Sequence, residues 1–80
     1  MIEIKILGTG CPKCNRLEQL TREAVAESGV EAHVSHVTEI DKIFAYPIAV
    51  TPALVINEAV KSSGNLPRKA QIVEWLTAGA

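Results

Sequence analysis

Two cysteines separated by two residues, Cys11 and Cys14, are the only cysteines in this chain of 80 residues. They lie in the segment Cys11-Pro12-Lys13-Cys14, where a predicted strand ends and a predicted helix begins. The start of a helix carries unpaired backbone N–H groups and the positive end of the helix dipole, and both favour a thiolate over a thiol. A dithiol in this place is suited to thiol–disulfide exchange, and the same pair is also compatible with metal binding or a structural disulfide.

The helix that carries the second cysteine is predicted over residues 12–28. Its apolar residues recur at helical spacing, at Leu17, Leu20, Ala24 and Val25. Cys14 extends this stripe and is expected to face the core, whereas Cys11 precedes the helix and is expected to be accessible. Pro12 suits the first helical position, and Gly29 suits the left-handed residue after the last turn.

The flanking segments predict strands and two further helices. Residues 2–7 alternate between isoleucines on one face and Glu3, Lys5 and Leu7 on the other, the period of a strand. Residues 30–37 predict a second strand, and residues 53–57 and 59–63 an antiparallel hairpin that turns near Asn57 and Glu58. Thr38 to Asp41 resembles a capping box that opens a short helix ending before Pro47, with Ile40, Ile43 and Phe44 on one side. The last helix is predicted from Pro67, with a buried side made of Ile72, Val73, Trp75 and Leu76.

The predicted order of elements is β-α-β-α-β-β-α. A strand, a helix and a second strand form a parallel crossover, and the terminal hairpin completes a mixed sheet. The sequence therefore predicts an α/β fold in one domain over residues 1–80, with a four-stranded mixed sheet and helices on both faces. This is the minimal thioredoxin-like arrangement.

The motifs Gly8-Thr9-Gly10-Cys11-Pro12-Lys13-Cys14 and Thr51-Pro52-Ala53-Leu54-Val55-Ile56 resemble those of the small thioredoxin-like or glutaredoxin-like redox-active disulfide proteins. The resemblance implies a protein dithiol–disulfide oxidoreductase. In this family the first cysteine attacks a substrate disulfide and the second resolves the mixed disulfide. Carried over, Cys11 is the nucleophile and Cys14 the resolving thiol. Pro12 would restrict the turn between them, and Lys13 would add a positive charge.

The resemblance gives a second site element at Thr51 and Pro52. In the family, the proline at this point is cis, lies beside the dithiol, and leaves the preceding backbone able to hydrogen-bond a substrate. Pro52 is then the cis-proline and Thr51 the substrate-binding backbone residue. The alternative is a trans proline that begins a strand.

The chain departs from the family pattern at several positions. Many thioredoxins place a buried carboxylate on the first strand, where this chain has Lys5, and a tryptophan where it has Gly10. The base that helps to deprotonate the resolving cysteine is therefore missing or supplied elsewhere. Glutaredoxins usually have an aromatic residue at the position of Lys13, and a Gly-Gly-Asp-like turn where this chain has Ser62-Ser63-Gly64-Asn65. These differences favour protein disulfides over glutathione as substrates.

Two alternatives to exchange remain open. The segment around the cysteines also looks like the start of a heavy-metal-associated domain, in which two thiolates bind a soft ion such as Cu(I). The second alternative is a redox-inactive docking module, which binds a partner through the Pro52 face. His33 and His36 are expected on opposite faces of a strand, as surface or edge histidines, which argues against a joint zinc site. Trp75 is expected in the core, and Tyr46 either borders the site near Pro52 or caps the second helix.

Composition narrows the expected partners. A net charge of −1 and a pI near 6.1 provide no basic surface for nucleic acid or anionic lipid. No signal peptide or spanning segment is evident, so a cytoplasmic location is expected. A monomer is expected as well. We expect protein disulfide substrates and an upstream reductase as partners, and neither a cofactor nor a metal.

Overall fold

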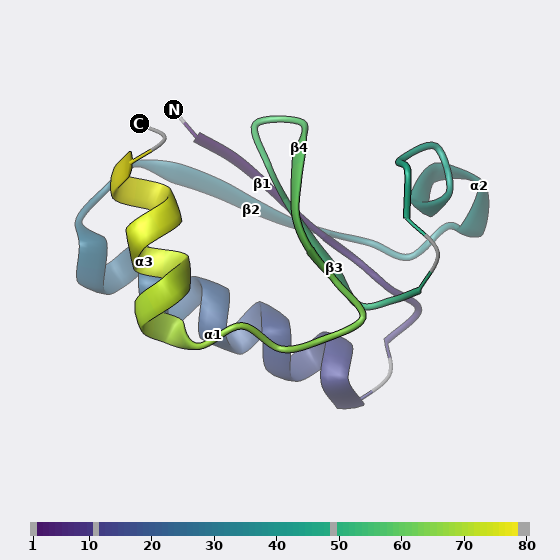
Figure 1. Ribbon diagram of the computed structural model, residues 1–80, viewed down its shortest axis with the longest axis horizontal. Helices are drawn as coiled ribbons and strands as arrows, with labels where there is room; N and C mark the ends of the chain where they lie inside the picture. The colour runs from purple at the N-terminus through teal and green to yellow at the C-terminus, as the bar shows by residue number, and fades with distance from the viewer. Residues whose placement is uncertain (1, 11, 49, 79–80) are drawn as a thin grey trace.

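One mixed sheet organises the computed structural model, which describes residues 2–10, 12–48 and 50–78 (Figure 1). Its strands in this part of the chain are β1 (Ile2–Leu7), β2 (Ala32–Val37), β3 (Ala53–Ile56) and β4 (Ala59–Ser63). The strand order is β2-β1-β3-β4, in which β1 pairs parallel with β2 and antiparallel with β3. The sheet confirms the mixed topology that the sequence predicts.

The helices lie on both faces of this sheet, as predicted. Helix α1 (Pro12–Ser28) and helix α3 (Lys69–Ala78) pack side by side on one face, and the single-turn helix α2 (Ile40–Ile43) lies near the other (Figure 1). The bounds of α1 agree with the sequence prediction, and Gly29 follows it with a φ of 73°. The element order β-α-β-α-β-β-α is confirmed.

Alternation along the strands divides the buried residues between the two faces. Ile2, Ile4 and Ile6 of β1 point toward α1 and α3, together with Leu17, Ala24, Leu54, Ile56, Ile72 and Leu76. Leu7 faces the opposite way and joins Ile43, Ala53 and Val55. Because β3 contributes to both clusters, it is buried on both sides, which explains its uninterrupted apolar sequence. Trp75 packs against the first cluster while half-buried, in line with the expected core position.

The hairpin between β3 and β4 turns where the sequence predicts. Asn57 and Glu58 have φ values of 49° and 67°, the left-handed pair that a two-residue turn requires. Asn57 also donates its N–H to the Glu3 carbonyl (2.8 Å) and accepts the Glu3 N–H on Oδ1 (3.0 Å). These two bonds fasten the turn to the edge of β1.

Helix α2 departs from the prediction. Its N-cap is Glu39, with no side-chain capping bond, so the expected capping box at Thr38 is wrong. Ile43 is buried, but Ile40 is 63% exposed and Phe44 is 55% exposed. A helix of one turn can direct only one residue onto the sheet, and the predicted apolar side therefore does not form.

Three other elements are shorter than predicted, among them β3, which ends at Ile56 rather than at residue 57. Strand β2 begins at Ala32 rather than at residue 30, because its register with β1 starts at the pair of Ile2 and Ala32. Helix α3 begins at Lys69 rather than at Pro67, since the Arg68 carbonyl accepts the first helical bonds, from Gln71 and Ile72.

Candidate functional site

Cys14 lies in the first turn of α1 and is fully buried. Its sulfur is packed against the backbone of Gly8, which follows β1. A Cβ atom placed on Gly8 would overlap Cys14 Sγ and would lie 3.1 Å from Cys14 Cβ. The absence of a side chain at position 8 is therefore what makes room for the sulfur. The inward orientation that the helical stripe predicts for Cys14 agrees with this burial.

The loop that carries Gly8 is held by bonds to β2 and to α1. Gly8 N–H donates to the Val37 carbonyl (3.0 Å), and the Gly8 carbonyl lies 3.1 Å from His36 Nε2. Asn15 Nδ2 donates to the Gly10 carbonyl at 3.5 Å. The backbone on both sides of Thr9 is thus fixed relative to the sheet and to the start of α1.

Pro52 also lies close to Gly8. The Thr51-Pro52 peptide bond is cis, Pro52 is buried, and its Cα is 4.0 Å from a Cβ placed on Gly8. The Pro52 carbonyl accepts the Gly64 N–H (2.8 Å), so the segment is fastened to the end of β4. The trans alternative is not the isomer present. The structure thus brings Cys14, Gly8 and Pro52 together from three separate parts of the chain.

The other predicted site residues lie around this cluster. Cys11, the predicted nucleophile, lies outside the described residues. Pro12 is the first residue of α1, and its side chain and that of Lys13 are exposed. Thr51 is partly exposed beside the buried Pro52. The catalytic and substrate-binding roles of these residues stay predictions.

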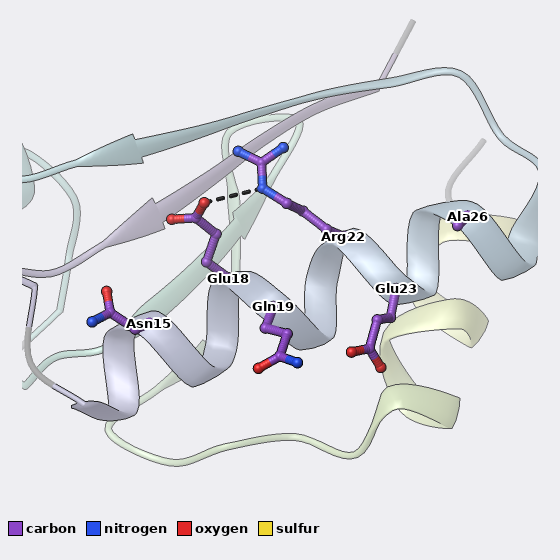
Figure 2. A pocket seen from close by; sticks show the side chains of 6 residues that line it. All are labelled: Asn15, Glu18, Gln19, Arg22, Glu23 and Ala26. Carbon is purple, nitrogen blue, oxygen red and sulfur yellow. Dashed lines mark hydrogen bonds and ion pairs between the residues drawn. The ribbon is translucent and has the colours of Figure 1, made fainter.

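A chain of charged groups, not predicted as part of the site, links the loop to α1. His36 Nδ1 lies 2.8 Å from Glu18 Oε1, and Arg22 Nε donates to Glu18 Oε2 at 3.0 Å. Glu18 and Arg22 project from the same side of α1, toward the strands, beside a shallow depression along this helix (Figure 2). The hydrogen bond from Arg22, and next that from His36, lowers the pKa of Glu18 below its usual value. Glu18 is therefore ionised at neutral pH.

The two histidines lie on opposite faces of β2, as the strand period predicts. His33 Nδ1 is 3.3 Å from Glu3 Oε2 on the face away from α1, where its side chain is largely exposed. His36 is mostly buried between β2 and α1. The prediction that they do not share a ligand site is consistent with this separation. Both histidines lie on β2, an edge strand of the sheet, as predicted, and His33 is largely exposed while the side chain of Glu18 covers one edge of the His36 ring.

Lys5 occupies the position at which many thioredoxins place a carboxylate, and its side chain points away from α1. Lys5 Nζ donates to Tyr46 Oη (2.9 Å) and to Glu58 Oε1 (2.8 Å). The bond to Glu58 raises the pKa of Lys5 and lowers that of Glu58. The Tyr46 N–H donates to the Ile43 carbonyl (3.3 Å) at the end of α2, in agreement with the predicted cap, and the Tyr46 ring packs on this face of the sheet.

Within residues 2–10, 12–48 and 50–78, no helix has the length and apolar character needed to cross a bilayer.

Comparison with known sequences finds matches that span nearly the whole chain. The family model described as Thioredoxin domain matches residues 2–77. A protein named thioredoxin from Methanocaldococcus jannaschii is 36% identical over 76 residues, which cover 95% of this chain and 87% of the relative. A protein named thioredoxin from Methanothermobacter thermautotrophicus is 35% identical over 77 residues, which cover 96% of this chain and 100% of the relative. Neither the metal-binding nor the docking alternative gains support from these matches.

Proposed function

The chain belongs to the thioredoxin family, and on this basis we propose that it reduces disulfides, or oxidises dithiols, of other proteins through Cys11 and Cys14. Family membership supports a thiol–disulfide oxidoreductase in general. The observation that carries the proposal is the place of Cys14, buried in the first turn of α1 against Gly8 and next to the cis Pro52. Such a place in the first turn of α1 supports a resolving role for Cys14, whereas Cys11 precedes the helix in the sequence.

In the first step of the proposed reaction, the Cys11 thiolate attacks one sulfur of a substrate disulfide. The substrate S–S bond breaks, a mixed disulfide forms between Cys11 and the substrate, and the departing substrate thiolate takes a proton from water. Cys11 has the sequence position of the attacking thiol because it directly precedes Pro12, the first residue of α1. The unpaired N–H groups of the first helical turn favour its thiolate.

In the second step, Cys14 loses its proton to solvent and attacks the Cys11 sulfur. The mixed disulfide breaks, a Cys11–Cys14 disulfide forms, and the second substrate thiolate takes a proton. Two electrons have then passed from the dithiol to the substrate, and the two substrate thiolates have taken their protons from solvent. A second dithiol of an upstream reductase returns the protein to its reduced form by the same two exchanges in reverse.

Thr51 and Pro52 are proposed to hold the substrate during both steps. Pro52 is placed beside Gly8, and Thr51 is partly exposed just before it. An extended substrate segment that pairs with the Thr51 backbone would bring its disulfide to the dithiol. Protein disulfides are the proposed substrates, in a reducing compartment such as the cytoplasm, where the dithiol form is maintained.

The test is to trap the mixed disulfide. Cys14→Ser removes the resolving thiol and should accumulate a covalent adduct with a disulfide substrate, detected by mass spectrometry and released by dithiothreitol. Cys11→Ser is the matched control and should accumulate none. In the wild type, Cys11 should alkylate faster than Cys14 below neutral pH. Tight stoichiometric Cu(I) binding without adduct formation or a reversible disulfide would instead support the metal-binding alternative.

A further inference from the structure

His36 has a hydrogen-bond acceptor at each of its two ring nitrogens. Nδ1 is 2.8 Å from the ionised Glu18 carboxylate, and Nε2 is 3.1 Å from the Gly8 carbonyl oxygen. A neutral imidazole has one N–H donor and one lone pair, so it can serve only one of these acceptors. The imidazolium form has two donors and satisfies both. The geometry is therefore that of a positively charged His36.

The carbonyl that His36 contacts belongs to the residue against which the Cys14 sulfur packs. Gly8 is bonded to β2 through its N–H and its carbonyl, at Val37 and at His36. A Cβ on the same residue would overlap Cys14 Sγ. Any change in the bond from His36 thus acts on the backbone that positions the buried thiol. Gly8 is the residue that lies between the His36 ring and the Cys14 sulfur.

The charged groups that face His36 come from α1. Glu18 contacts the His36 ring directly. Arg22 Nε donates to the same Glu18 carboxylate at 3.0 Å (Figure 2). From β1, the side of the sheet under α1 presents isoleucines and the Gly8 carbonyl, while Glu3 and Lys5 point to the opposite face. With His36 protonated, the chain of His36, Glu18 and Arg22 carries a net charge of +1, and with His36 neutral it carries none.

We infer that His36 is a positioning residue of the dithiol, which as an imidazolium fixes Gly8 against Cys14 and supplies a positive charge that favours the reduced, thiolate-bearing state. This inference rests on the proposed function, since it concerns the same exchange reaction. It also provides a charged group at Gly8, the residue against which Cys14 packs, in a chain that has Lys5 on its first strand.

The test compares three variants by two measurements. His36→Gln keeps a donor but removes the charge, His36→Lys keeps a positive charge with several donors, and His33→Gln changes the other histidine of β2, on the opposite face. The first measurement is the equilibrium constant with the glutathione couple between pH 6 and 8. The second is the pH profile of iodoacetamide alkylation of the dithiol.

His36→Gln should shift the equilibrium toward the disulfide by about three- to tenfold, because the thiolate loses a nearby positive charge. A tenfold shift corresponds to about 30 mV for a two-electron couple. Its alkylation profile should move to higher pH. His36→Lys should restore values near the wild type, and His33→Gln should match the wild type in both measurements.

The outcomes separate this inference from the proposed function. If the wild type forms no reversible disulfide with glutathione or dithiothreitol, the proposed function fails. If the wild type exchanges normally but His36→Gln equals it at every pH, or His36→Lys equals His36→Gln, the role assigned to the His36 charge is wrong. Thermal unfolding of each variant shows whether it is folded, and His36→Lys keeps the comparison valid should His36→Gln be unstable.

Discussion

Gly8→Ala perturbs the contact on which the candidate site depends. The added methyl group would overlap the Cys14 sulfur and approach Cys14 Cβ to 3.1 Å. Gly8 is not among the residues with a left-handed backbone, so alanine is compatible with its φ and the effect is steric alone. Cys14 is short and fully buried, and it has no flexible end that could move into solvent.

The size of the effect follows from this lack of room. The sulfur or the first turn of α1 must move by about 1 Å to restore an ordinary van der Waals contact. Overpacking of this kind usually costs about 1–3 kcal/mol of unfolding free energy. Misplacement of a reacting atom by about 1 Å can slow a reaction by up to about a hundredfold. We expect the resolving step by Cys14 to slow by at least about tenfold.

The assay has two parts and a matched control. Urea unfolding gives the free energy, and mass spectrometry after acid quench follows conversion of the glutathione mixed disulfide into the internal disulfide. Gly29→Ala is the control, because Gly29 has a φ of 73° and no atom within 4 Å of an added Cβ. It should cost about 1 kcal/mol through backbone strain and leave the resolving step unchanged. The reasoning is refuted if Gly8→Ala resolves as fast as Gly29→Ala, or if it unfolds with the free energy of the wild type.

Glu18→Gln should remove a part of the stability that depends on pH. The pKa of Glu18 is lowered from 4.5, so its contribution is present above about pH 4.5 and is lost as the pH falls through the lower folded value. The unfolding free energies of the wild type and Glu18→Gln should differ by about 1 kcal/mol at pH 7 and converge once the pH is below the lowered pKa of Glu18, and parallel curves would contradict this. Ile43→Ala should cost about 2–4 kcal/mol, because this side chain is buried under α2, whereas Ile40→Ala should cost less than about 0.5 kcal/mol. Equal losses in urea unfolding would show that α2 does not pack through Ile43. Lys5→Gln should leave the glutathione equilibrium unchanged, since the Lys5 ammonium lies on the face of the sheet away from α1, and a clear shift would show that its charge reaches the dithiol.

The parts of the fold that the sequence predicts well are those with a long repeated pattern or a marked end. The alternating isoleucines of β1 fix its bounds and its buried face. Pro12 and Gly29 mark the two ends of α1, and their positions follow from backbone properties of single residues. Helix α2 fails because one turn contains too few residues to establish a period, so Ile40 and Phe44 could not be separated from Ile43 by pattern.

The candidate site divides in the same way. The inward orientation of Cys14 follows from the helical spacing of the apolar residues in α1, and this spacing is visible in the sequence. The contact between His36 and Gly8 needs the register of β1 with β2, in which Ile6 is paired with His36, and the rotation of α1 that brings Glu18 over the sheet. Neither is set by the residues near His36. One of its partners is also a backbone carbonyl, which leaves no trace in the side-chain pattern.

The position of Lys5 shows why the first strand supplies no buried base to the dithiol in this chain. Its neighbours Ile4 and Ile6 fill the face under α1, so the alternation of β1 sends the Lys5 side chain to the far face, where Tyr46 and Glu58 bind it. An acidic residue substituted there would meet Glu58 and not the dithiol. Directly after β1, the Gly8 N–H donates to the Val37 carbonyl, and the Gly8 carbonyl lies 3.1 Å from His36 Nε2. A charged side chain that is to act on this loop must therefore come from β2 or α1, and His36 and Glu18 are the residues placed to do so.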